Sequence, residues 1–174
     1  MSAITSLQRG LLLLGLALGV GVPAALTAQK ESLAASGQTV LLELAPRDPR
    51  SLMQGDYMVL RYDIVRDLNN QYDAWPVDGE LVIQPDGDDV ARYVRRHEGE
   101  SLGEGEQRLR YRVRGGVLRL GAEDFFFQEG TADQYSRARY GELKVTDGGD
   151  ALLVGLRGEE LQALGAPGAN PLQR

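Results

Sequence analysis

Residues 48–64 decide the fold, and they read Asp48-Pro49-Arg50-Ser51-Leu52-Met53-Gln54-Gly55-Asp56-Tyr57-Met58-Val59-Leu60-Arg61-Tyr62-Asp63-Ile64. Asp48 followed by Pro49 has the order of a helix N-cap and a first helical residue, and Gly55 suits the left-handed residue that ends a helix. After Gly55 the apolar residues recur at every second position: Met58, Leu60, Tyr62 and Ile64. This spacing puts them on one face of a strand, opposite Tyr57, Val59, Arg61 and Asp63. The stretch predicts a short helical turn followed by a strand with one face in a core.

The run Gly55-Asp56-Tyr57-x-x-Leu60-x-Tyr62 resembles the motif after which the bacterial GDYXXLXYXX family is named, and Asp48-Pro49-Arg50 matches that family's usual lead-in. Later segments also resemble the family: Leu109-Arg110-Tyr111-Arg112-Val113-Arg114, Phe126-Phe127-Gln128-Glu129-Gly130, Ala138-Arg139-Tyr140-Gly141 and Leu152-Leu153-Val154-Gly155-Leu156. The resemblance extends over roughly residues 37–164. It implies a membrane anchor, an extracytoplasmic domain of unknown biochemical function, and genes that often neighbour those of multi-pass membrane proteins.

The motif supplies the candidate interaction residues, which are Asp48, Pro49, Arg50, Gly55, Asp56, Tyr57, Leu60 and Tyr62. Leu60 and Tyr62 share the apolar face, which favours a place in the core, and Gly55 most simply meets a backbone requirement. Asp56 has two interpretations, a cap for backbone N–H groups of the turn or a contact to a partner, and the cap is favoured. Tyr57 points away from the core, and for it a structural and a functional role are equally open.

Residues 10–29 contain no charge and are long enough, at helical rise, to cross the ~30 Å core of a bilayer. The alternative is a cleaved secretory signal, but cleavage after Ala28 would place Leu26 at the −3 position, and neither this site nor the one after Ala25 reads well. An uncleaved anchor in the bacterial inner membrane is therefore favoured, with Arg9 on the cytoplasmic side. This predicts five regions: a cytoplasmic start (1–9), a transmembrane anchor (10–29), a linker that can extend the helix (30–37), an extracytoplasmic β domain (38–164) and a flexible tail (165–174).

Composition narrows the classes of function. The 174-residue chain has no cysteine and a single histidine, His97, so thiolate metal sites, His clusters for zinc and a Ser-His-Asp triad are not expected. Only Arg9 among the 19 basic residues precedes residue 30, and all 25 acidic residues follow it, so 18 basic and 25 acidic residues leave the remainder with a net charge of −7. A net-acidic domain argues against nucleic acid as a partner.

Alternating apolar residues predict short strands on both sides of the motif. Val40, Leu42 and Leu44 alternate before it, and Leu81-Val82-Ile83 leads into a hairpin turn at residues 85–88. Strands over 140–146 and 151–156 flank a second turn, Asp147-Gly148-Gly149-Asp150. Eight to ten such strands predict a mainly β domain, an antiparallel barrel or sandwich with one or two short helices, in addition to the N-terminal transmembrane helix.

The clearest strand carries the candidate anion contacts, Arg108, Arg110, Arg112 and Arg114. Leu109, Tyr111 and Val113 face the other way, so the arginines form a row with a spacing of roughly 7 Å. Such a row suits phosphate, a uronate or an acidic partner. The alternative, which is favoured, is a solvated face neutralised by carboxylates from neighbouring strands.

Other segments have less specific patterns. Phe125 and Phe127 are expected on one face of a strand and Phe126 on the other. Thr131 and Gln134 fit a capping box that opens a helix through about Arg139, and residues 158–164 fit a closing helical turn. Residues 67–79 are expected to form a loop whose Trp75 folds back on the core edge or serves binding, with the first favoured. Residues 98–106 lack the ligand order of a calcium loop, which favours a solvated turn.

An enzymatic function can be tested by comparing one sequence run with the corresponding run in a class of peptidases. Pro-x-x-Leu-x-x-Gly-Asp before an alternating strand is similar to a run in type I signal peptidases, which use a serine nucleophile and a lysine base. Here Arg47 stands at the nucleophile position, and Lys30 and Lys144 are the lysines of the chain. The sequence therefore predicts a non-enzymatic accessory subunit of a multi-pass membrane protein, without cofactor or metal. An envelope module that binds an anionic component is the alternative, and a hydrolase with a signal-peptidase-like fold comes third.

Overall fold

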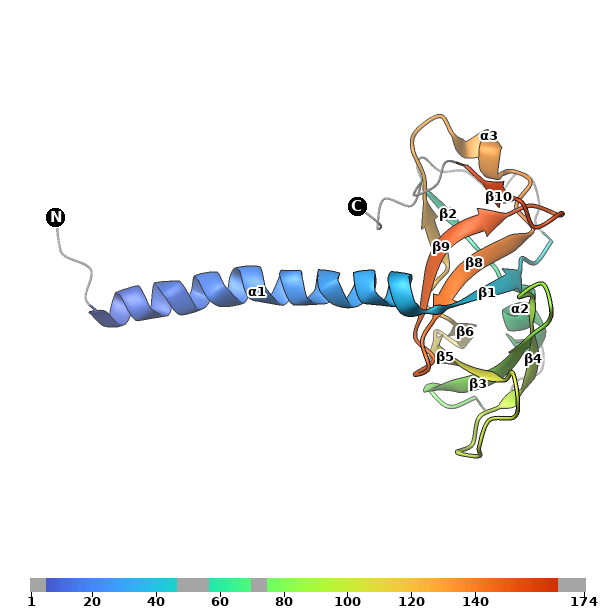
Figure 1. The fold of residues 1–174 in the computed structure, drawn as a ribbon, viewed down its shortest axis with the longest axis horizontal. Coiled ribbons are helices and arrows are strands. Elements are labelled where there is room, and N and C mark those ends of the chain that lie inside the picture. Colours follow the sequence, from blue (N-terminus) through green and yellow to red (C-terminus); the bar gives the residue numbers. More distant parts are fainter. Residues whose placement is uncertain (1–5, 47–56, 70–74, 166–174) are drawn as a thin grey trace.

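The computed structural model describes residues 6–46, 57–69 and 75–165. It begins with one long helix, α1 (Ser6–Ser36), which projects from the side of a β domain (Figure 1). Within α1, the segment Gly10–Ala28 has a mean hydropathy of 2.1, and none of it is buried inside the protein. An apolar helix at this position fits a membrane anchor or a signal sequence. The helix continues to Ser36, so the polar segment after the apolar one extends it as the sequence allows.

In the described part of the chain, ten short strands make up three antiparallel sheets. The first sheet has the order β1-β8-β9-β10, the second β4-β3-β5-β6, and the third is the pair β2-β7. The strands are β1 (Gln38–Glu43), β2 (Tyr57–Val59), β3 (Asp78–Pro85), β4 (Ala91–Arg96), β5 (Gln107–Arg114), β6 (Val117–Arg119), β7 (Asp124–Phe126), β8 (Tyr140–Val145), β9 (Ala151–Arg157) and β10 (Ala163–Leu164). The mainly β, antiparallel class predicted from the sequence is confirmed.

The two four-stranded sheets curve around one core as two half-barrels, and main-chain contacts join them. Leu41 forms a parallel bridge with Val90, and Leu44 forms an antiparallel bridge with Tyr62. The N–H of Arg110 donates to the carbonyl of Gly149 at 2.8 Å. The buried core draws on every sheet and includes Val40, Leu42, Leu60, Tyr62, Leu81, Ile83, Leu109, Tyr111, Phe125, Leu143 and Leu156.

The predicted strand after Gly55 is shorter than expected and is followed by a helix. β2 ends at Val59, Tyr62 forms an isolated bridge, and α2 spans Asp63–Asn69. The prediction was therefore wrong for Ile64, which lies in α2, and for the loop expected from residue 67. Asp63 lies in the first turn of this helix and pairs with Arg66 at 2.6 Å, which are both helix-stabilising features.

Two other helix predictions were also wrong in detail. The second short helix, α3, covers only Ala132–Tyr135, and Thr131 forms no side-chain cap. Its hydroxyl donates instead to the carbonyl of Gln128, which precedes the helix, at 2.6 Å. The hydroxyl therefore does not accept a hydrogen bond from a backbone N–H group of the helix, as the predicted capping box requires. Residues 158–164 form a turn and the strand β10 rather than a helical turn, since Leu161 has a positive φ of 59° that a right-handed helix does not contain.

Candidate functional site

The motif strand has an inner and an outer face from Tyr57 onward. Met58, Leu60 and Tyr62 are all buried, which confirms the predicted alternation, while Tyr57 is exposed. Five motif residues lie outside the described residues: Asp48, Pro49, Arg50, Gly55 and Asp56. The helical turn at 48–55 and the capping role of Asp56 therefore stay predictions.

Tyr62 closes the inner face of this segment against β8. Its hydroxyl donates to the carbonyl of Ala122 at 2.5 Å. Burial, and then the nearby Glu123 carboxylate, raises the pKa of the Tyr62 phenol well above its ordinary value. A Cβ atom on Gly141 would lie only 2.9 Å from Cε1 of Tyr62, so the ring rests on the backbone of that glycine. Two segments that are far apart in the sequence, the motif and the strand after Ala138, thus meet in the core.

The outer face of β2 carries an exposed apolar cluster, which we call the aromatic patch: Tyr57, Val59 and Phe126. The register pairs Tyr57 with Phe126 and Val59 with Asp124. The two aromatic rings lie 5.9 Å apart between centroids. The three side chains are 42%, 41% and 39% exposed, in the order Tyr57, Val59, Phe126. Tyr57 therefore packs on a neighbouring ring and still presents apolar surface outward.

An open groove lies beside the inner face of β2, between the end of β1 and α3. Its volume is about 1050 Å³ as the described residues bound it. The apolar part is formed by Leu44, Met58 and Leu60, and the charged residues around it are of both signs: Asp133, Arg137, Arg139, Glu159 and Glu160. Because these charges are mixed, the groove has no clear preference for a ligand of one sign.

The arginine row on β5 divides into two halves. Arg108 lies 3.5 Å from a carboxylate oxygen of Glu80 and donates to the carbonyl of Asp147 at 2.6 Å. Arg110 lies 3.6 Å from Glu80 and 2.9 Å from Asp150. Within the described part of the chain, Arg112 and Arg114 form no ion pair. The predicted neutralisation by carboxylates is confirmed for Arg108 and Arg110. Arg112 lies opposite Asp78 in the register, but neither it nor Arg114 forms an ion pair among the described residues.

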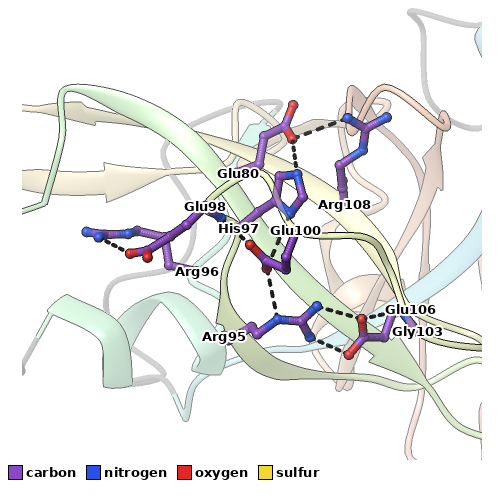
Figure 2. A network of polar contacts seen from close by, with 9 residues as sticks. All are labelled: Glu80, Arg95, Arg96, His97, Glu98, Glu100, Gly103, Glu106 and Arg108. Carbon is purple, nitrogen blue, oxygen red and sulfur yellow. Dashed lines mark hydrogen bonds and ion pairs between the residues drawn. The ribbon is translucent and has the colours of Figure 1, made fainter.

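His97 and the acidic turn after β4 extend the carboxylate cluster (Figure 2). The ring nitrogens of His97 lie 3.9 Å from Glu80 and 3.4 Å from Glu100. Arg95 pairs with Glu100 at 2.9 Å and holds both carboxylate oxygens of Glu106. Residues 98–105 are exposed, so the predicted solvated turn is confirmed, and Arg95 ties this turn back to the sheet.

These contacts lower the pKa values of two carboxyl groups in the turn. The pKa of Glu100 is lowered to about 2, first by hydrogen bonds from the backbone N–H groups of Glu100 and Glu98 and then by Arg95. The pKa of Glu106 is lowered, first by Arg95 and then by the N–H of Gly103. Both carboxylates stay ionised at neutral pH and hold the turn in place. Among the described residues, no group of three His, Asp or Glu side chains is arranged to hold a metal ion.

The other candidate residues have local structural contacts. Trp75 packs edge-on against Tyr111, with ring centroids 5.1 Å apart, and Arg96 lies over its ring. The prediction that this tryptophan folds back on the core is confirmed. Lys144, the lysine weighed as a catalytic base, donates to the hydroxyl of Thr39 on the neighbouring strand at 2.8 Å. Arg47, at the position of a peptidase nucleophile, lies outside the described residues.

Sequence reasoning missed three residues that shape these surfaces. Phe126 is the ring partner of Tyr57, and Arg119 lies directly opposite Arg112 across β5 and β6. Arg95 organises the acidic turn. The alternation of residues 125–127 correctly placed Phe126 on the face opposite Phe125 and Phe127, but a strand pattern does not reveal which strand lies next to it.

Comparison with known proteins found one match. No curated protein and no solved structure matches the chain. The family described as GDYXXLXY protein matches residues 20–156. This range covers more than half of the chain and contains β2, the arginine strand β5, β8 and all but the last residue of β9. The protein is therefore a member of the GDYXXLXY family, as the motif in residues 55–62 indicated.

Proposed function

We propose that this protein is a non-enzymatic accessory subunit, anchored by α1 in the bacterial inner membrane, whose β domain binds a multi-pass membrane protein outside the cytoplasm. The observation that carries the proposal is the aromatic patch on β2 and β7. Tyr57 belongs to the family motif and yet lies outside the core, where it is 42% exposed. Burial in a partner interface would remove this apolar surface from water.

The character of the patch fits a protein partner. Aromatic side chains are enriched in the buried centres of protein interfaces, and Tyr is frequent among the residues that dominate binding. Tyr57 and Phe126 lie on strands whose opposite face is held in the core by Met58 and Phe125, which are almost fully buried. The strands that carry the patch are therefore ordered before binding, which reduces the conformational entropy that is lost when a partner binds.

The anchor favours a partner in the same membrane. The apolar side chains of α1 are more than half exposed from Leu11 to Leu26, and a bilayer would cover them. A domain held at the membrane surface meets other membrane proteins at a high effective concentration. A modest apolar patch is then sufficient for a lasting complex, since the tether has already brought the two proteins together.

The test is purification of the full-length protein from its native membranes in mild detergent. We compare the wild type with Tyr57→Ala/Phe126→Ala, and with Tyr93→Ala/Val94→Ala as a matched control, because Tyr93 and Val94 are exposed to a similar extent on β4. We expect a multi-pass membrane protein, identified by mass spectrometry, in comparable amount with the wild type and the control and absent with the patch variant. Purification of the wild type alone, or retention of the partner by the patch variant, would overturn the proposal.

A further inference from the structure

Three arginines on the hairpin of β5 and β6 form a second surface, which we call the basic patch: Arg112, Arg114 and Arg119. Arg112 and Arg119 are paired residues in the register, so their side chains emerge on the same face. Arg114 lies two residues further along β5 and shares that face. All three are exposed, and none forms an ion pair within the part of the chain that the structure describes.

This arrangement is unfavourable for the isolated protein. Like charges directly opposite each other on neighbouring strands are destabilising. On the same strand, the charges of Arg108 and Arg110 are neutralised by ion pairs with the carboxylates of Glu80 and Asp150. Asp78 is paired with Arg112 in the register of β3 and β5, but it forms no ion pair with it. The basic patch therefore has an unmet capacity to hold an anion.

Apolar side chains lie beside the basic patch. Val117 follows the Gly115-Gly116 turn and is 43% exposed, and Val77 is 74% exposed. A shallow depression of about 460 Å³ is lined by Val77, Asp78, Arg112, Val113 and Arg114. Arginines next to exposed aliphatic residues match the chemistry of a membrane surface, where phosphate groups lie above the acyl chains.

The strands that carry the basic patch, β5 and β6, lie in the half of the domain from which α1 emerges (Figure 1). The side chain of Gln107, at the start of β5, donates to that of Gln38, at the start of β1. α1 itself ends at Ser36, two residues before β1. The contact between Gln107 and Gln38 holds the first residue of β5 next to the first residue of β1, where α1 joins the domain.

The length of α1 sets the distance between this side and the membrane. From Ala28, where the apolar segment ends, to Ser36 the helix adds eight residues, or about 12 Å at the helical rise. The headgroup layer occupies roughly 5–7 Å of this on each side of the bilayer. The remaining gap is comparable with the length of an extended arginine side chain, and it is shorter than the Debye length of about 8 Å at physiological salt.

We infer that the basic patch binds the phosphate groups of anionic lipids in the membrane that α1 spans, with Val117 at the interface. The inference rests on the anchoring part of the proposed function. It assigns a surface different from the aromatic patch, and it explains why the arginines nearest the hairpin turn lack the ion pairs that neutralise Arg108 and Arg110. Binding would orient the domain on the membrane and present the aromatic patch in a fixed direction.

The absence of cysteine makes a site-specific test straightforward. Full-length Val117→Cys protein is labelled with an environment-sensitive fluorophore and reconstituted in lipid nanodiscs, either of phosphatidylcholine alone or with added phosphatidylglycerol. We expect a blue shift of the emission only in the discs that contain phosphatidylglycerol. High salt should reverse the shift, because screening weakens contacts between exposed charges.

The basic patch is then tested by Arg112→Gln/Arg119→Gln in the labelled protein. The matched control is Arg137→Gln/Arg139→Gln, which removes the same charge from exposed arginines beside the groove. We expect loss of the lipid-dependent shift in the first variant and its retention in the second. An equal signal in both kinds of disc, or a shift that survives the basic-patch variant, would overturn the inference alone. Failure of the protein to enter nanodiscs would overturn the anchor and this inference together.

Discussion

The motif strand β2 and the arginine strand β5 follow the same rule of alternation but differ in what their outer faces do. Both segments bury every second residue: Met58 in β2 and Leu60 just after it, and Leu109 and Tyr111 in β5. The first half of β5 faces Glu80 and Asp150, so its outer charges are neutralised within the protein. On the outer face of β2, Tyr57 lies opposite Phe126 and Val59 lies opposite Asp124, and the three apolar side chains remain exposed. Alternation decides which residues point into the core. The neighbouring strand decides whether the outward side chains find a partner within the protein.

The largest expected effect separates the two tyrosines of the motif. Tyr62→Ala removes a ring that is 1% exposed and should lower the free energy of unfolding by about 3–5 kcal/mol. Tyr57→Ala, on the outer face, should cost less than about 1 kcal/mol. Thermal unfolding of the full-length protein in detergent, followed by circular dichroism, measures both. Similar losses would contradict the division of the strand into a structural and a binding face.

The next effect tests the contact below Tyr62. Gly141→Ala places a methyl group 2.9 Å from Cε1 of the ring, which forces the ring or β8 to shift and should cost about 1–3 kcal/mol. Gly148→Ala is the matched control, because its nearest neighbour lies at 3.7 Å, an ordinary contact. The same unfolding measurement applies. Equal stability of the two variants would show that the core tolerates movement of Tyr62.

A smaller, pH-dependent effect concerns the acidic turn beside the arginine strand. The folded pKa values of Glu100 and Glu106 lie below the ordinary value of 4.5. Their contribution to stability is therefore complete above that pH and is lost as the pH falls toward about 2, where Glu100 becomes protonated in the folded state. Hydrogen exchange of amides 97–106 should rise over this range, after correction for the intrinsic rate.

Replacing the arginine that holds the turn sharpens this prediction. In Arg95→Gln the loss of protection should begin at a higher pH, chiefly through Glu106, for which Arg95 is the main cause of the lowered pKa. Arg92→Gln serves as the control, since Arg92 lies on the same strand and forms no ion pair within the described residues. An unchanged profile in Arg95→Gln would mean that the turn is held by its backbone alone.

The smallest expected effect is a difference in stability between variants in the two halves of the arginine row. Arg110→Gln removes an exposed pair with Asp150 and should cost about 0.2–1 kcal/mol. Arg112→Gln relieves repulsion from Arg119 and should be neutral or slightly stabilising. Chemical denaturation of the two variants side by side resolves the difference in sign. A clear loss of stability in Arg112→Gln would show that this arginine has a structural partner.

The sequence predicted much of the β domain because its strands are short and strictly alternating. The hairpins at residues 85–88 and 147–150 were predicted by their Asp and Gly residues, and both are present. The run from Tyr62 was harder, because Ile64 and Leu68 also fit the i, i+4 spacing of a helix. In the structure the strand ends and a helix begins after Tyr62, whose carbonyl accepts hydrogen bonds from the N–H groups of both Val65 and Arg66.

The sequence by itself determined the inner faces, the family and an apolar helix at the N-terminus, because hydrophobic period and composition are local properties. Only the tertiary structure decided which outer faces are neutralised and which are open. The pairing of Tyr57 with Phe126 joins positions far apart in the chain, as does the contact of Arg110 with Asp150. Such contacts depend on the order of strands in the sheets, which is set by packing of the whole core.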